Sequence, residues 1–107
     1  MGKGQLQGAL DLLILKMLAR GPLHGYGLAQ HIQQVSEEAL RVEEGSLYPA
    51  LHRMERLDWI SAEWKATENG RRAKYYKLTL HGRKELAREE KDWSRVVGAV
   101  SKILRYA

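Results

Sequence analysis

The sequence predicts a mainly α-helical fold with a β-hairpin wing, followed by one long C-terminal helix. Three observations favour this winged helix-turn-helix. Apolar residues recur with a helical period in the first forty residues, a further helix opens at Glu43, and two short strands flank Asn69–Gly70. A helix directly followed by a hairpin is typical of winged domains. We expect residues 1–79 to form this domain and residues 80–107 to form the long helix.

The composition favours an anionic partner. The chain has 107 residues, which suits one small domain, and its formal net charge is +5. Basic and acidic side chains balance in residues 1–40, so the excess lies in the hairpin and the last helix. Nucleic acid and a membrane surface both attract such a charge, although a basic balance alone also fits a small solvated protein. The absence of cysteine excludes disulfides and thiolate metal sites.

The first helix is predicted over residues 6–19 and is apolar on two sides. The residues expected on its buried face are Leu6, Leu10, Leu13, Ile14, Met17 and Leu18. Leu12 and Leu15 make a second side apolar. A helix that is apolar all round in a small protein is usually covered by its own core and by a second chain. Gly21–Pro22 ends the helix, because proline cannot continue its hydrogen bonds.

Two further helices make up the predicted helix-turn-helix. The first covers residues 26–38, where Gly25 and Gly27 at its start permit either close backbone approach or a special backbone dihedral. The second begins between Glu43 and Ser46, because Pro49 is tolerated only near a first turn. Residues expected to point inward are Tyr26, Ala29, Ile32 and Val35 in the first, and Leu47, Leu51, Met54 and Leu57 in the second.

The register of the hairpin follows from its apolar face. That face consists of Ile60, Ala62 and Trp64 on the strand over residues 59–65, and of Tyr76 and Leu78 on the returning strand. A strict two-residue Asn-Gly turn would mix the two faces of the ribbon. We therefore predict a loop of about three or five residues centred on Gly70, with Gly70 at positive φ. This loop pairs Trp64 with Tyr76 and Ala62 with Leu78.

The last helix, predicted over residues 79–107 with Thr79 as its cap, carries an approximate heptad pattern of apolar residues. One small domain cannot cover this pattern and the second side of the first helix together, whereas a symmetric homodimer can. The residues expected at the dimer interface are Leu6, Leu10, Leu13, Leu86, Trp93, Val96, Val100, Ile103 and Leu104.

The helix that opens at Glu43 and the hairpin supply the candidate DNA contacts. Candidates for reading a major groove are Ser46, Tyr48, Pro49, His52 and Arg53, and candidates on the wing are Arg71, Arg72, Lys74 and Tyr75. The return strand has four cations and no acid, which suits double-stranded DNA. An ordinary solvated helix face and a solubilising turn are the alternatives. Tyr75 can stack on a sugar or pack beneath the wing, and Arg53 can pair with guanine or hold a phosphate.

Other classes of site are weakly supported. Trp93, with Val97 one turn later, is either a plain dimer-core residue or a flat wall for a small aromatic effector between two subunits. The four histidines are not spaced as metal ligands, and no catalytic set or phosphate loop is visible, so we expect no metal, no cofactor and no enzyme. No apolar run approaches the roughly 18 residues of a membrane span, so a cytoplasmic protein without a membrane partner is expected.

Several motifs resemble the PadR-type transcriptional regulators. They are His24-Gly25-Tyr26-Gly27, Glu44 to Glu55 (EGSLYPALHRME) and Gly70 to Thr79 (GRRAKYYKLT), and the likeness covers almost the whole chain. Within this family, the sequence is similar to the small subfamily with a single C-terminal dimerisation helix. The resemblance implies a homodimeric repressor of a palindromic promoter operator, with the helix of Ser46 in the major groove and the wing beside it. It also implies that Trp93 can contact flat aromatic drugs. A ligand sensor or protein-interaction module without DNA contact is the alternative.

Overall fold

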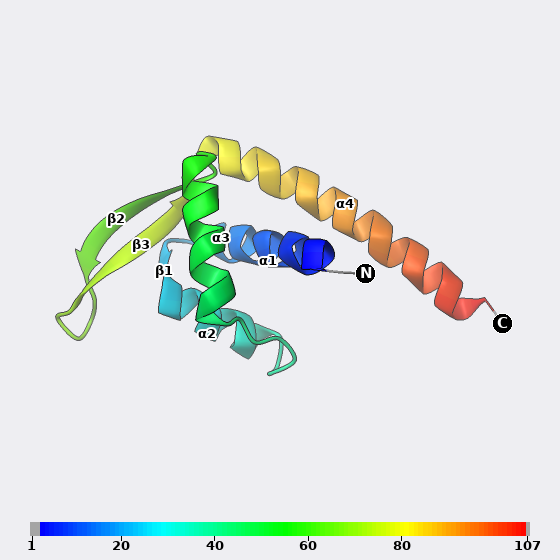
Figure 1. The fold of residues 1–107 in the computed structure, drawn as a ribbon, viewed down its shortest axis with the longest axis horizontal. Helices are drawn as coiled ribbons and strands as arrows, with labels where there is room; N and C mark the ends of the chain where they lie inside the picture. The colour runs from blue at the N-terminus through cyan, green and yellow to red at the C-terminus, as the bar shows by residue number, and fades with distance from the viewer. Residues whose placement is uncertain (1–2, 107) are drawn as a thin grey trace.

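The computed structural model describes residues 3–106, and of their side chains those from Ala9 onward. The elements are α1 (Lys3–Leu18), β1 (Leu23–His24), α2 (Gly25–Val35), α3 (Glu44–Arg56), β2 (Ile60–Ala66), β3 (Arg72–Leu78) and α4 (Leu80–Arg105). The three strands form one antiparallel sheet in the order β1-β3-β2. The molecule measures 57 × 29 × 23 Å, with the hairpin and the end of α4 at opposite ends (Figure 1). The predicted fold class is confirmed.

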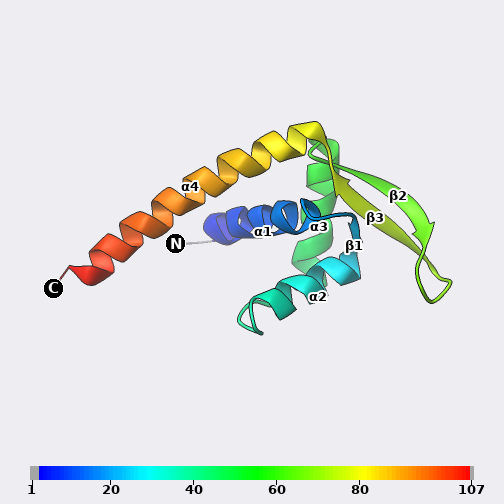
Figure 2. The ribbon, with the colours of Figure 1, turned by 180° about the vertical axis from the view of Figure 1, so that it is seen from behind.

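Helix α1 lies at the centre, in contact with α2, α3, α4 and β3. It runs beside α4 in both views of the ribbon (Figures 1 and 2). Leu15 was expected on a second side of the helix, but it is fully buried in the core with Ile14 and Leu18, whereas Leu10 and Leu13 are half-buried. The reason is that α4 covers part of α1 within the same chain. The side chain of Leu6 lies outside the described residues.

Helix α2 begins one residue earlier than predicted, and its buried face differs. Leu28 and Ile32 are buried one turn apart, whereas Tyr26 is 67% exposed and Val35 is 60% exposed. The expected inward positions of Tyr26 and Val35 were therefore wrong. Strand β1 determines which side of α2 faces the core. His24 pairs with β3, and its ring Nδ1 accepts a hydrogen bond from the Gly27 N–H at 3.0 Å.

The hairpin has the predicted faces but not the predicted pairs. Ala62 pairs with Tyr76 and Ile60 with Leu78, so the apolar faces match. Trp64 pairs with Lys74 rather than with Tyr76, which is a shift of two residues. A shift of two preserves the faces because side chains alternate with a period of two. Residues 67–71 form the loop, and Gly70 has a φ of +80°, as expected.

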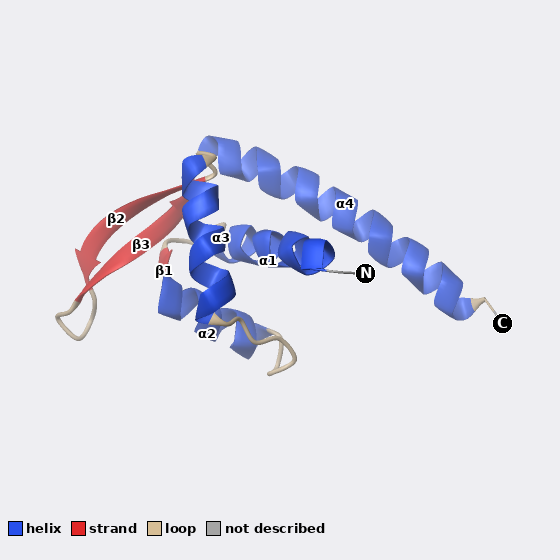
Figure 3. Cartoon of the chain, viewed as in Figure 1, coloured by secondary structure: helices blue, strands red, loops and turns tan. Residues whose placement is uncertain are grey.

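The start of α4 is fixed to the turn between α3 and β2, a contact that we call the joint (Figure 3). Thr79 Oγ1 accepts a hydrogen bond from the Gly82 N–H at 2.9 Å and donates to the Asp58 carbonyl at 2.6 Å. The Thr79 N–H donates to the Trp59 carbonyl at 3.1 Å. A Cβ on Gly82 would lie 1.9 Å from that carbonyl oxygen, so only glycine fits here. The cap predicted at Thr79 is confirmed.

The core ends within the second turn of α4. Leu86 belongs to the buried cluster that also includes Ile14, Leu51 and Tyr76. Its expected place in a dimer interface is therefore corrected, because its side chain is buried inside its own protomer. Leu57, expected on the buried face of α3, caps the end of that helix and is exposed. None of the helices in residues 3–106 is long and apolar enough to cross a bilayer.

Candidate nucleic-acid interface

Helix α3 presents a polar face away from the core. Its buried residues are Leu47, Ala50, Leu51 and Met54. Pro49, His52 and Arg56 recur at three- and four-residue intervals on the opposite side, and all three are exposed, as is Ser46. Pro49 lies inside the helix and has no N–H to donate to the Gly45 carbonyl. This face offers mixed donors and acceptors of the kind that read base edges.

Arg56 is a further candidate on α3 that is not among the DNA contacts predicted from the sequence. It is exposed and borders the same shallow hollow as His52. No ion pair forms to it among the residues that the structure describes. The signal was present in the spacing, because Arg56 follows Pro49 by seven residues and therefore shares its face.

Arg53 lies on the flank of α3 rather than on its outward face. Its Nη2 donates to Asp11 Oδ1 of α1 at 2.6 Å, and the pair is partly buried. The hydrogen bond that Arg53 donates to Asp11 is the main cause that raises the pKa of Arg53, against a smaller lowering by desolvation. Of the two predicted roles, holding a phosphate is therefore disfavoured, because the charge of Arg53 is already compensated.

Tyr48 lies between the two helices of the helix-turn-helix. A Cβ on Gly25 would meet the Tyr48 hydroxyl at 2.8 Å, so the glycine allows the ring to approach the start of α2. The close approach predicted at Gly25 is thus confirmed, and Tyr48 remains only partly exposed. The ring lines a cleft of about 410 Å³ between α3 and the wing. The other lining residues are His24, Gly25, Tyr26, His52, Trp64, Ala73, Lys74 and Tyr76.

Lys74 connects the wing to α3 instead of projecting from the wing. Its Nζ donates to Glu55 Oε1 at 3.0 Å and lies 5.5 Å from the ring centre of Tyr76. The hydrogen bond to Glu55 raises the pKa of Lys74. Lys74 therefore fixes the distance between the wing and α3 and is a weaker candidate for a phosphate contact than the sequence indicated.

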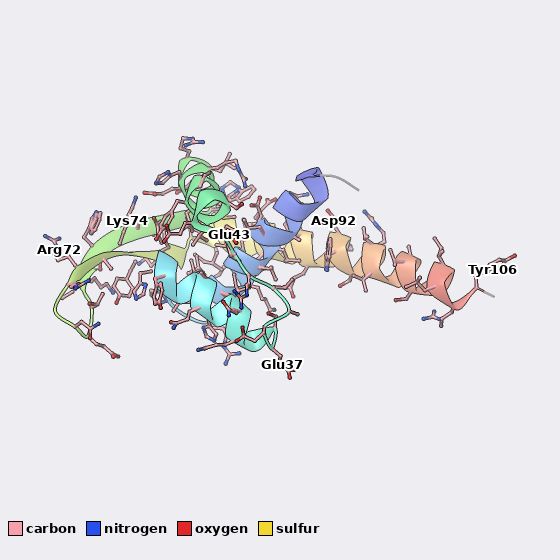
Figure 4. The ribbon with its side chains drawn as sticks, turned by 60° about the horizontal axis from the view of Figure 1, so that its bottom comes forward. Glu37, Glu43, Arg72, Lys74, Asp92 and Tyr106 are labelled. Atoms are coloured by element: carbon pink, nitrogen blue, oxygen red, sulfur yellow. The ribbon has the colours of Figure 1, made fainter. Side chains whose placement is uncertain are left out.

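The wing tip carries the accessible cations. Arg71 and Arg72 are exposed, and neither forms an ion pair within the described part of the chain. Figure 4 shows Arg72 toward the tip and Lys74 nearer α3. Tyr75 packs beneath the wing, where its ring lies edge-on to His24 at 5.1 Å and below Lys65 at 5.6 Å. Arginines at such a tip can reach phosphate or enter a minor groove.

A second exposed region lies on the far part of α4, which we call the seam. Its members are Trp93, Val96, Val97, Val100, Ile103 and Leu104. Trp93 and Val97 are one turn apart and are 41% and 46% exposed, so their side chains are accessible on one side of the helix. Ile103 and Leu104 are 73% and 79% exposed. No group of three metal-ligating side chains is found among the described residues.

A helix with a mixed polar face, held beside a cationic hairpin, defines a winged helix-turn-helix DNA-binding protein. Comparisons with known proteins agree. The model of the transcriptional regulator PadR-like family matches residues 14–88. The chain belongs to the PadR family of transcriptional regulators, which are DNA-binding proteins without enzymatic activity.

Individual relatives support the assignment. The chain is 33% identical over 85 residues to a transcriptional regulator of Mycobacterium tuberculosis, covering 79% of this chain and 76% of that protein. A solved PadR-like transcriptional regulator from Bacillus cereus is 30% identical, with a TM-score of 0.83 and coverage of 98% and 100%. A transcriptional regulator from Clostridium thermocellum is 25% identical, with a TM-score of 0.86 and coverage of 98% and 99%.

Proposed function

We propose that this protein is a homodimeric repressor that occupies a roughly palindromic operator in promoter DNA. A symmetric dimer presents two copies of α3 on one side, and such helices meet half-sites about one helical turn apart. The observation that carries the proposal is the seam on α4. Six large apolar side chains of one helix are exposed in the protomer, and a second copy of the same helix is their simplest cover. Leu10 and Leu13 of α1 are half-buried and can extend this interface.

The contacts with DNA divide between the two elements. Ser46, Pro49 and His52 on α3 face the major groove, joined by Arg56 and flanked by Tyr48 and Arg53. Arg71 and Arg72 on the wing contact phosphate or the neighbouring minor groove. Lys74 braces one face of the wing against α3, and Tyr75 packs against His24 on the opposite face. The exposure of the first three residues and of both wing-tip arginines supports this division.

Sedimentation of the full chain and a footprint on its own upstream DNA test the proposal together. We expect a dimer at micromolar concentration and two protected half-sites related by two-fold symmetry. A protein that stays monomeric would contradict the dimer. A dimer that leaves every duplex unprotected in dilute salt would instead favour the alternative, a sensor or interaction module without DNA contact.

The wing has its own test. Replacing Arg71 and Arg72 by alanine removes two cations from the tip, so affinity should fall for all duplex sequences. If each arginine neutralises one phosphate, the slope of log K against log salt should flatten by about 0.9 for each. Fluorescence anisotropy at several salt concentrations measures both effects, and an unchanged slope would remove the wing from the interface. Glu63→Gln, on the neighbouring strand, controls for damage to the hairpin.

Release by a small aromatic effector is the second part of the proposal. In a dimer joined along the seam, Trp93 and Val97 of both chains can line a flat apolar slot, and their shared exposed face supports this. Planar aromatic compounds should then quench tryptophan fluorescence. Trp59 and Trp64 also fluoresce, so the quenching must disappear in Trp93→Leu. Quenching that persists in this variant would place the ligand elsewhere.

A further inference from the structure

The ion pair between Asp11 and Arg53 joins the central helix to α3. Asp11 lies on α1 and is only 8% exposed, although it is a carboxylate. Arg53 Nη2 donates to it at 2.6 Å, and 42 residues separate the two in sequence. Within the described residues, Arg53 is the only ion-pair partner of Asp11. The side chains differ in access, because that of Arg53 is 38% exposed and that of Asp11 only 12%.

This arrangement restricts what Arg53 can do. A buried carboxylate that loses its partner is strongly unfavourable, so Arg53 cannot leave Asp11 to follow a phosphate. Arg56, one turn later and without an ion pair among the described residues, is free to do so. The two arginines of α3 therefore differ, because Arg53 is held by Asp11 whereas Arg56 forms no ion pair among the described residues.

The exposed side of Arg53 opens into a hollow of about 360 Å³ beside the outward face of α3. Its lining residues are Leu10, Asp11, Gly45, Ser46, Pro49, Ala50, Arg53 and Arg56. A guanidinium has five N–H donors in a rigid plane, and the contact with Asp11 uses one of the two terminal nitrogens. The remaining edge of the plane has a fixed direction, which is what bidentate pairing with a guanine edge requires.

We propose that Asp11 is a positioning residue that holds Arg53 as a fixed base-reading donor, so that Asp11 contributes to sequence specificity without touching DNA. This inference rests on the proposed function, because it requires α3 to lie in a major groove. The opposing hypothesis is that Asp11 competes with DNA for Arg53 and weakens binding to every sequence. The two hypotheses predict opposite effects when Asp11 loses its charge.

The test uses two DNA probes. One is a duplex that the wild-type chain enriches from a random-sequence pool, and the other is a scrambled duplex of the same composition. Affinity for each is measured by anisotropy at several salt concentrations for wild type, Asp11→Asn, Arg53→Lys and Arg53→Ala. The matched control is Glu90→Gln, which raises the net charge by the same unit and breaks the Lys16–Glu90 pair between α1 and α4 without contacting α3.

We expect Asp11→Asn to reduce the preference for the enriched duplex by roughly tenfold, as the loss of one oriented bidentate contact would. Affinity for the scrambled duplex and the salt slope should not change. Arg53→Lys should behave similarly, since lysine keeps the charge but has no planar fork. In an Arg53→Ala background, Asp11→Asn should cause no further loss, because the two residues act as a unit. Glu90→Gln should leave the preference intact.

Other outcomes overturn the inference. Tighter binding of Asp11→Asn to both probes, with a salt slope steeper by about 0.9, would show competition instead of positioning. An unchanged preference in both Asp11→Asn and Arg53→Lys would remove Arg53 from base reading while leaving the proposed function intact. If the wild-type chain enriches no sequence at all, the proposed function fails and this inference fails with it. Thermal melting checks that each variant is folded, and Arg53→Lys serves as the test if Asp11→Asn is not.

Discussion

The first and last parts of α4 differ in what covers their apolar side chains. At its start, Gly82 lies against the Trp59 carbonyl and Leu86 is buried in the core. From Trp93 onward, the large apolar residues are exposed. One continuous helix therefore serves two purposes. Its first turns complete the fold of a protomer, and its last turns carry surface that only another molecule can bury. Apolar spacing alone does not separate these purposes, because both parts follow the same helical period.

The largest expected effect comes from Leu86→Ala. Truncating this buried side chain should lower the free energy of unfolding by about 2–5 kcal/mol. Urea unfolding followed by circular dichroism measures the loss. The matched variant Ile103→Ala shortens an exposed apolar residue on the same helix. On the proposed dimer, it should raise the dimer dissociation constant while the dilute protomer keeps native circular dichroism. The comparison would be contradicted if Leu86→Ala weakened the dimer without lowering the free energy of unfolding, while Ile103→Ala unfolded the protomer.

A smaller effect is expected from Gly82→Ala. The added Cβ would overlap the Trp59 carbonyl oxygen, so the start of α4 must shift, at a cost of about 1–3 kcal/mol. Gly98→Ala is the control on the same helix, because nothing lies within 4 Å of a Cβ there. That control should stabilise the protein by roughly 0.5–1 kcal/mol, since alanine favours helix over glycine. Equal melting temperatures for the two variants would mean that the joint is not tightly packed.

The smallest effect concerns the cap. Thr79→Ala removes the acceptor for the Gly82 N–H and the donor to the Asp58 carbonyl, which should cost about 1 kcal/mol. Thr79→Ser keeps the hydroxyl and should restore most of the loss. Hydrogen exchange at the Gly82 amide provides a local readout, because its protection should fall in the alanine variant alone. Protection that persists in Thr79→Ala would indicate that packing, rather than the cap, fixes the joint.

Local patterns predicted the elements well. Gly21–Pro22 ended α1, Thr79 capped α4, and the loop with Gly70 at positive φ was found, because each depends on the residue itself and its immediate neighbours. The buried face of α2 was predicted only in part, because Ile32 is buried as expected whereas Leu28 was missed. Tyr26 and Val35 had the correct spacing, but pairing of His24 with β3 turned the helix toward Leu28 and Ile32. Contacts distant in sequence decided that face.

Predictions for the candidate site also succeeded where they depended on local position and failed where they depended on contacts distant in sequence. Ser46, Pro49, His52 and the wing-tip arginines are exposed, as a helical or hairpin position predicts. Arg53 and Lys74 were assigned to DNA from their charge and from their places in the helix and on the return strand, yet Asp11 and Glu55 compensate them. Each of these acids lies far from its partner along the chain, so no local pattern could reveal the pairing. Arg56 was not among the predicted DNA contacts although its spacing from Pro49 already placed it outward.

The tight contact at Gly82 determines how insertions in α4 would move the seam. The first turn of α4 is packed against the winged domain. Each residue inserted between Leu86 and Trp93 would therefore rotate the seam about the helix axis by about 100° and advance it by about 1.5 Å. Insertions of about seven or about eleven residues bring the seam back to within about 20° of its original direction. In the proposed dimer, insertions in α4 would therefore change the separation of the two α3 helices in coarse steps, whereas a change in the crossing angle of the two α4 helices would change it finely.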